Sequence, residues 1–170
     1  FVRFFGTDNG IAIGEATPDF PTGVLLTQDG GESWQTAPGY RSAGWHAAAF
    51  SELYDGIVVG PRGRISLVAG TNVAPPRIDA GSLRGVRSVA MSDGLSGWAV
   101  GDGALVLRSN NGGVSWQPPE QPLPLELSRF ADFKAVAAVG NRVWIAGNPG
   151  GRIWHSRDGG LSWAGRQPAS

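Results

Sequence analysis

The sequence contains no cysteine, which excludes disulfide bridges and thiolate-bound metal sites. Its 14 basic and 14 acidic residues cancel, so no overall electrostatic field attracts nucleic acid or an acidic membrane surface. No apolar run approaches the roughly 18 residues that a membrane-spanning helix needs. We therefore expect no nucleic-acid partner and no direct membrane insertion, and the 170 residues suffice for one domain with its own core.

Glycine and proline, by contrast, are abundant, with 27 and 12 residues. This composition is typical of many short strands joined by tight turns, and no segment suggests a long helix. The sequence therefore predicts an all-β fold.

One eight-residue pattern, S/T-x-D/N-G-G-x-S-W, occurs three times. The Asp or Asn side chain can accept backbone N–H groups and close a turn, and glycine can take the positive φ that such a turn requires. Tryptophan adds a large apolar surface. We interpret the pattern as a structural turn, formed by Thr27, Asp29, Gly31 and Trp34, by Ser109, Asn111, Gly113 and Trp116, and by Ser156, Asp158, Gly160 and Trp163.

The spacing of this pattern predicts propeller blades. Trp34 and Trp116 are 82 residues apart, which is twice 41, and Trp116 and Trp163 are 47 apart. A further copy is expected near residue 75, where residues 70–76 keep Asn72 but lack the second glycine and the tryptophan. We expect a single β-propeller domain or part of one, with blades at about 1–42, 43–83, 84–127 and 128–170.

The pattern resembles the Asp-box, or BNR repeat, of sialidase-type propellers. In such repeats a blade buries its sheet only against neighbouring blades, so four blades form a small ring or part of a larger one. Asp-box propellers usually have six or more blades, which favours part of a six- to eight-bladed propeller. The chain is then expected to associate with further blades or with another chain.

Residues 97–116 extend this resemblance, because they join the second strand Gly-Trp-Ala-Val-Gly, a glycine turn, a third strand and the box. This arrangement resembles the repeat of the photosystem II assembly and stability factor family. The resemblance implies a non-catalytic scaffold without cofactors that binds a protein, such as a membrane complex or an assembly intermediate. It also implies a periplasmic, lumenal or extracellular location.

The resemblance further implies that arginines contact the partner. Residues 56–92 hold five arginines against Asp79 alone, the most basic stretch of the chain. The alternative is that these arginines are merely solvated on strand edges and loops. As the candidate partner-binding residues we take Arg62, Arg64, Arg84 and Arg87.

A glycoside hydrolase or a glycan-binding propeller is the alternative function. Hydrolysis would need two carboxylates across a cleft. Asp55-Gly56 and Asp93-Gly94 recur at one position in successive blades, which favours turns. The candidate carboxylates are Asp19, Asp55, Asp93, Asp102 and Asp132. A sugar-stacking surface is disfavoured because Trp34, Trp98, Trp116, Trp144 and Trp163 occupy repeated positions that predict packing, and we expect Trp45 and Trp154 in the core.

The boxes also invite interpretation as calcium loops. Calcium takes six to eight oxygen ligands, whereas a box offers one carboxylate, or none where Asn111 replaces aspartate. His46 and His155 lie in different repeats without a partner at metal-ligand spacing. We therefore expect no metal site.

Overall fold

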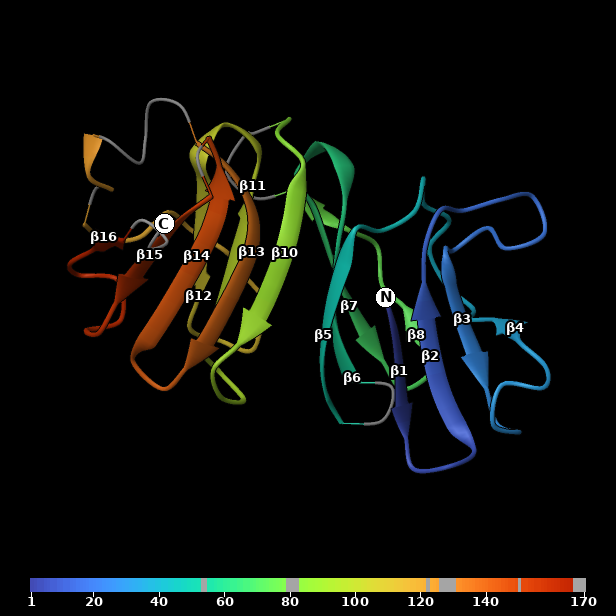
Figure 1. Cartoon of the computed structure of the whole chain (residues 1–170). Coiled ribbons are helices and arrows are strands. Elements are labelled where there is room, and N and C mark those ends of the chain that lie inside the picture. The colour runs from blue at the N-terminus through green and yellow to red at the C-terminus, as the bar shows by residue number, and fades with distance from the viewer. Residues whose placement is uncertain (53–54, 79–82, 122, 126–130, 150, 167–170) are drawn as a thin grey trace.

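The computed structural model describes residues 1–52, 55–78, 83–121, 123–125, 131–149 and 151–166. They form four antiparallel sheets that follow one another along the chain and stand side by side in a row (Figure 1). The expected all-β architecture of four successive blades is confirmed. No described helix is long and apolar enough to cross a membrane.

The strands follow the sequence in a simple meander. The first sheet contains β1 (Val2–Phe5), β2 (Asn9–Ile13), β3 (Val24–Thr27) and β4 (Gln35–Thr36). The second contains β5 (Ala47–Glu52), β6 (Asp55–Val59), β7 (Arg64–Ala69), β8 (Asn72–Val73) and β9 (Arg77–Ile78). The third contains β10 (Val86–Met91), β11 (Gly97–Gly101) and β12 (Leu105–Ser109), and the fourth contains β13 (Asp132–Val139), β14 (Arg142–Asn148), β15 (Arg152–Ser156) and β16 (Ala164–Arg166).

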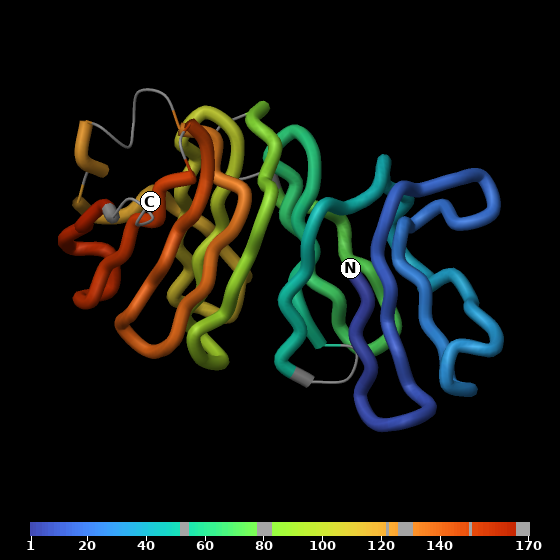
Figure 2. Tube along the Cα trace, in the orientation of Figure 1, coloured from blue at the N-terminus to red at the C-terminus, as the bar shows by residue number. Residues whose placement is uncertain are grey.

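Two short 3₁₀ turns connect second strands to third strands: η1 (Pro61–Gly63) in the second sheet and η2 (Asp102–Ala104) in the third. The chain runs through each sheet along the same up-and-down course, which Figure 2 shows as four similar windings. The expected boundary between the third and fourth blades, at residues 127 and 128, lies outside the described residues. Asp55 and Gly56, expected in a turn, begin β6, and residues 53 and 54 before them lie outside the described residues.

The second sheet departs from the others at the position of the missing box. There the chain turns at Gly70, whose φ is +59°, and continues directly into β8, which pairs with β7. The backbone N–H of Gly70 donates to the carboxylate of Asp55 across the 3.0 Å between them. A tight hairpin thus takes the place of the box.

Three apolar cores lie between neighbouring sheets. The first contains Ile11, Trp45 and Phe50, and the second contains Ile57, Val86 and Trp116. The third contains Trp98, Phe133 and Trp154. Alternate residues of each strand enter these cores, as expected for sheets that pack face to face.

The two end sheets each have one face without a neighbouring sheet. On the fourth sheet, Ile153 is 45% exposed and Trp144 is half-buried, whereas Trp98 at the corresponding position of the third sheet is 2% exposed. The expectation that Trp144 is packed is therefore met only in part, because no other sheet formed by the described residues covers it. The predicted core positions of Trp45 and Trp154 are confirmed, at 5% and 8% exposure.

Candidate functional site

The two ends of the sheets carry different kinds of loop. The box loops, residues 28–33, 110–115 and 157–162, follow the third strands at the lower end in Figure 1. We call this the box end. The opposite end carries η1, η2 and the starts of β5, β10 and β13, together with Arg62, Arg64, Arg84 and Arg87, and we call it the arginine end.

The three boxes share most of their closing hydrogen bonds, but Trp163 Nε1 in the third box has no partner among the described residues. In the first, the Thr27 hydroxyl donates to the Asp29 carboxylate over 2.7 Å, and the backbone N–H of Gly31 donates to Thr27 Oγ1 over 3.0 Å. The backbone N–H and the hydroxyl of Ser33 donate to Asp29, and Trp34 Nε1 donates to the Gly31 carbonyl. Equivalent bonds hold Ser109, Asn111, Gly113, Ser115 and Trp116 in the second box and Ser156, Asp158, Gly160 and Ser162 in the third.

These bonds stabilise the ionised form of the two box aspartates. Hydrogen bonds from the Ser33 side chain and backbone, with one from Thr27, hold the pKa of Asp29 well below its usual range. The corresponding bonds from Ser162 and Ser156 lower the pKa of Asp158 to about 2. Because both carboxylate oxygens of Asp29 and of Asp158 accept hydrogen bonds from their own loop, these aspartates serve to close the turns.

At the arginine end, Asp102 joins two sheets. Its carboxylate receives Arg87 Nη2 at 2.7 Å and Arg87 Nε at 2.9 Å, and Lys134 Nζ lies 3.5 Å away. The hydrogen bond from Arg87 lowers the pKa of Asp102, and the same bond raises the pKa of Arg87. Arg87 Nη1 also lies 3.5 Å from His46 Nε2. The sequence had singled out Arg87 but gave no signal for these partners.

The other three candidate arginines differ in how they are held. Arg84 Nη1 donates to the carbonyl of Gly103 over 2.8 Å, which places it beside η2. Arg64 begins β7 and is half-buried. Arg62 is exposed at the centre of η1, and η1 lies against the start of β10, where the Val86 N–H donates to the Gly60 carbonyl. The structure thus brings the candidate arginines of two sheets to one end.

Arg62 has an unusual backbone conformation. Its φ is +57°, in the left-handed region that costs an ordinary residue about 1 kcal/mol or more. The corresponding position of the third sheet is Gly103, with φ +62°. The second sheet therefore holds an arginine side chain at a turn position where glycine is the unstrained choice.

The candidate carboxylates are not arranged as a catalytic pair. Asp93 accepts the backbone N–H groups of Leu95 and Ser96, and these bonds lower its pKa. Asp132 accepts the backbone N–H of Gly103, as Asp55 does that of Gly70. Asp102 is paired with Arg87, and Asp19 is exposed in the loop between β2 and β3. Among the described residues, no three acidic or histidine side chains are grouped so that they could hold a metal ion.

Relatives of known identity support the family and the fold. A photosystem II assembly lipoprotein Ycf48 from Synechococcus sp. (strain CC9902) is 30% identical over 109 residues, which cover 62% of this chain and 31% of that protein. The chain thus spans about a third of this curated relative.

Three solved structures share the fold. YCF48 bound to a D1 peptide has a TM-score of 0.59 at 23% identity, covering 71% of this chain and 40% of that one. YCF48 from Cyanidioschyzon merolae has a TM-score of 0.56 at 24% identity, covering 71% and 36%. An ancestral GH74 enzyme has a TM-score of 0.63 at 20% identity, covering 97% and 24%. These neighbours match a partial propeller.

The model of one family matches residues 78–167, which is more than half of the chain and includes the third and fourth sheets with their boxes. The matched region includes residues 97–116, the repeat on which the resemblance to this family was based. The chain belongs to the photosynthesis system II assembly factor YCF48 family.

Proposed function

We propose that this chain is a non-catalytic propeller scaffold that binds a protein partner at its arginine end. The partner is a peptide segment of a membrane complex or of an assembly intermediate, and acidic side chains on it pair with Arg62, Arg64, Arg84 and Arg87. Arginine suits this role because its planar guanidinium binds carboxylates in a bidentate manner.

The observation that carries this proposal is the strained turn at Arg62. Strained backbone conformations cluster at functional sites, where the strain is retained for the sake of the side chain. Arg62 is exposed, and its guanidinium has no hydrogen-bond partner among the described residues. A glycine here would relieve the strain and would remove only this exposed cation, so a role in binding explains the arginine.

Relatives indicate the class of partner and the location. One solved relative is a YCF48 bound to a D1 peptide, and the curated relative is named a photosystem II assembly lipoprotein. We propose that a peptide ligand binds the loops at the arginine end of the row of sheets. A lipoprotein relative supports a location outside the cytoplasm, which we propose for this chain as periplasmic, lumenal or extracellular.

The alternative is a glycan-processing propeller, and it rests on the fold alone, since the GH74 neighbour is only 20% identical. Four of the five candidate carboxylates hold turns or pair with arginine, as described above. General acid–base catalysis would need two of them free across a substrate cleft. The geometry therefore supports the binding function better than the hydrolytic one.

A panel of overlapping peptides covering D1 tests the proposal. Labelled peptides would be titrated with the chain and with the variants Arg62→Glu and Arg84→Glu, by fluorescence anisotropy at low and high salt. We expect at least one peptide to bind, each charge reversal to weaken it by roughly tenfold or more, and salt to weaken it further.

Arg41→Glu is the matched control, because Arg41 is exposed, lies outside the candidate set and undergoes the same change of charge. It should bind like the parent chain. A peptide that binds equally well to the Arg62 and Arg84 variants would refute the assigned surface. If no D1 peptide binds and an oligosaccharide panel is bound or hydrolysed, the scaffold function itself is wrong.

A further inference from the structure

His46 and Arg87 meet at the arginine end, where the second and third sheets join. His46 directly precedes β5 and is exposed, and Arg87 lies in β10 with 39% of its side chain exposed. Each of these two sheets is packed against a sheet on either side. The contact between the two side chains therefore belongs to the interior of the row of sheets and not to its ends.

The surroundings of the His46 ring determine which of its nitrogens carries the proton. Nδ1 lies 2.8 Å from the Val86 carbonyl, which can only accept, so Nδ1 is protonated and donates. In the neutral ring Nε2 is then an acceptor, and it lies 3.5 Å from Arg87 Nη1. That distance is at the outer limit of a hydrogen bond, so the two side chains stabilise each other little.

Asp102 sets the direction of the Arg87 guanidinium. Its carboxylate accepts hydrogen bonds from Arg87 Nε and Nη2, at 2.9 and 2.7 Å, which are the paired donors on one edge of the guanidinium. Nη1 lies on another edge and faces His46. Because two bonds fix a planar group, the position of Nη1 is established before any partner binds.

The charges near the His46 ring are mostly positive. Arg87 faces the ring from β10, Lys134 of β13 lies beside Asp102, and Arg62 stands on η1 at the same end. The negative charges are Asp102, which is already paired, and Asp132, whose charge also raises the pKa of Arg87. The cluster therefore favours an anion.

A second proton on the ring requires such an anion. Protonated Nε2 is a donor, so it opposes the donor Arg87 Nη1 and adds a positive charge beside a cation. An ionised carboxylate removes this conflict, because its two oxygens can accept one hydrogen bond from each nitrogen. Proton uptake by the ring and binding of a carboxylate thus favour each other.

We propose that His46 and Arg87 form a carboxylate-binding site, in which His46 takes up a proton from solvent when an ionised carboxylate of the peptide partner binds. The carboxylate accepts from His46 Nε2 and Arg87 Nη1. Binding then strengthens as pH falls through the range in which histidine changes its charge. This inference rests on the proposed function and adds to it a residue, His46, that was not among the candidates, together with a dependence on pH.

The test uses a D1 peptide without histidine that the parent chain binds, measured at pH 5.5 and at pH 8. Carboxylates stay ionised at both values, since their ordinary pKa is about 4. We expect the parent chain to bind roughly tenfold more tightly at pH 5.5. His46→Gln should remove most of this difference, because an amide takes up no proton. Isothermal titration calorimetry in two buffers of different ionisation enthalpy should show proton uptake by the parent chain and less by the variant.

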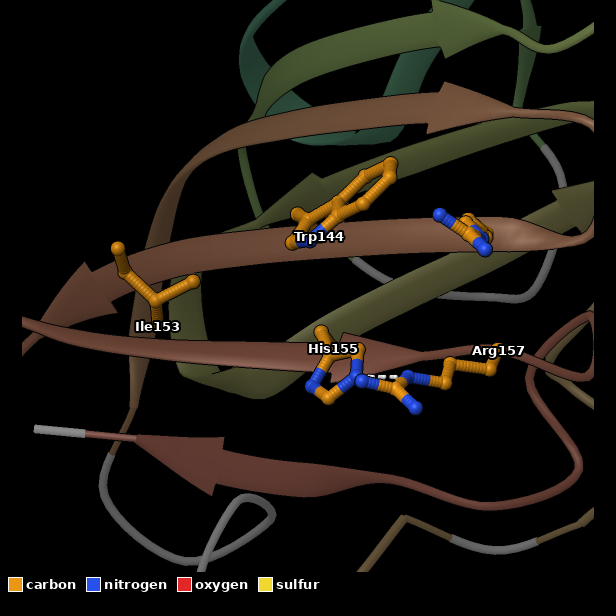
Figure 3. A pocket seen from close by; sticks show the side chains of 5 residues that line it. Trp144, Ile153, His155 and Arg157 are labelled. Carbon is orange, nitrogen blue, oxygen red and sulfur yellow. Dashed lines mark hydrogen bonds between the residues drawn. The ribbon is translucent and has the colours of Figure 1, made fainter.

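His155→Gln is the matched control, because His155 is the other of the two histidines and also faces an arginine. Arg157 Nε donates to His155 Nε2 over 3.0 Å, in a cavity of about 400 Å³ on the fourth sheet that Figure 3 shows. This cavity lies away from η1 and η2, on β14 and β15. The His155→Gln variant should keep the pH dependence of the parent chain, and circular dichroism should show that both variants are folded.

Two altered peptides identify the carboxylate. One has an amidated C-terminus, and the other has its acidic side chains replaced by amides. One of the two changes should abolish the pH dependence. The inference is overturned, with the proposed function intact, if the peptide binds equally at both pH values, if His46→Gln keeps the pH dependence, or if neither altered peptide loses it. A parent chain that binds no D1 peptide at either pH overturns both.

Discussion

The box end and the arginine end of the sheets differ in how far their residues repeat from sheet to sheet. At the box end one loop recurs with the same hydrogen bonds, whether its acceptor is Asp29, Asn111 or Asp158. At the arginine end the second and third sheets share a 3₁₀ turn that differs in its residues, Pro61-Arg62-Gly63 against Asp102-Gly103-Ala104, and a charged pair, Asp102 with Lys134, links the third sheet to the fourth. Repetition in three of the four sheets indicates a role in folding, whereas features of a single sheet are free to serve a partner.

The largest expected effect concerns a box glycine. In Gly160→Ala the new methyl group overlaps the Trp98 indole, and the φ of +89° is unfavourable for alanine. We expect the free energy of unfolding to fall by about 3 kcal/mol or more, from overpacking together with backbone strain. Urea denaturation measures it.

The neighbouring glycine of the same box is the control. Gly159 also has a positive φ, +69°, but a Cβ there would meet nothing closer than 3.9 Å. Gly159→Ala should cost only about 1 kcal/mol, from backbone strain alone. Equal losses in the two variants would mean that contact with Trp98 does not hold the sheets together.

Much of the box end could be predicted from the sequence. The pattern is local, so the turn, the glycines and the period of the blades follow from residues close together in the chain. The position of Trp144 also follows from its equivalence with Trp98. Its exposure does not, because burial depends on whether another sheet follows.

The arginine end was predicted less fully. The cluster of arginines between residues 56 and 92 is visible in the sequence. The partners of Arg87 are not, since Asp102 follows it by 15 residues and His46 precedes it by 41, and these side chains meet only once the strands have paired and the sheets have packed. The left-handed conformation of Arg62 also depends on the turn geometry between two paired strands.

A smaller effect on stability depends on pH and distinguishes the two aspartate boxes from the asparagine box. The depressed pKa values of Asp29 and Asp158 mean that their ionised forms stabilise the fold above the ordinary aspartate pKa, about 3.9, and that this contribution is lost as pH falls toward 2. Asn111 accepts the same backbone N–H, from Ser115, and its Nδ2 donates to the Ser115 hydroxyl, so this box is held without a titrating group. The melting temperature of the double variant Asp29→Asn, Asp158→Asn should therefore fall less between pH 4 and pH 2 than that of the parent.

Thermal melts across this pH range provide the measurement. Asn111→Asp is the converse variant and should steepen the loss of stability with acid, because it adds a third titrating box. If the asparagine double variant and the parent lose stability in parallel, the box aspartates do not contribute to acid unfolding.

The smallest expected change in stability comes from Arg62 and has the opposite sign. Arg62→Gly removes the cost of a left-handed arginine, so we expect the free energy of unfolding to rise by about 0.5 to 1 kcal/mol. Peptide binding at the arginine end should weaken at the same time, because the exposed guanidinium is gone. Arg64→Gly is the control, since Arg64 has an ordinary extended conformation, with φ −71°, and should lose stability. A gain in stability with unchanged binding would show that the strain at Arg62 serves no partner, and the contrast between the two ends would then lose its functional meaning.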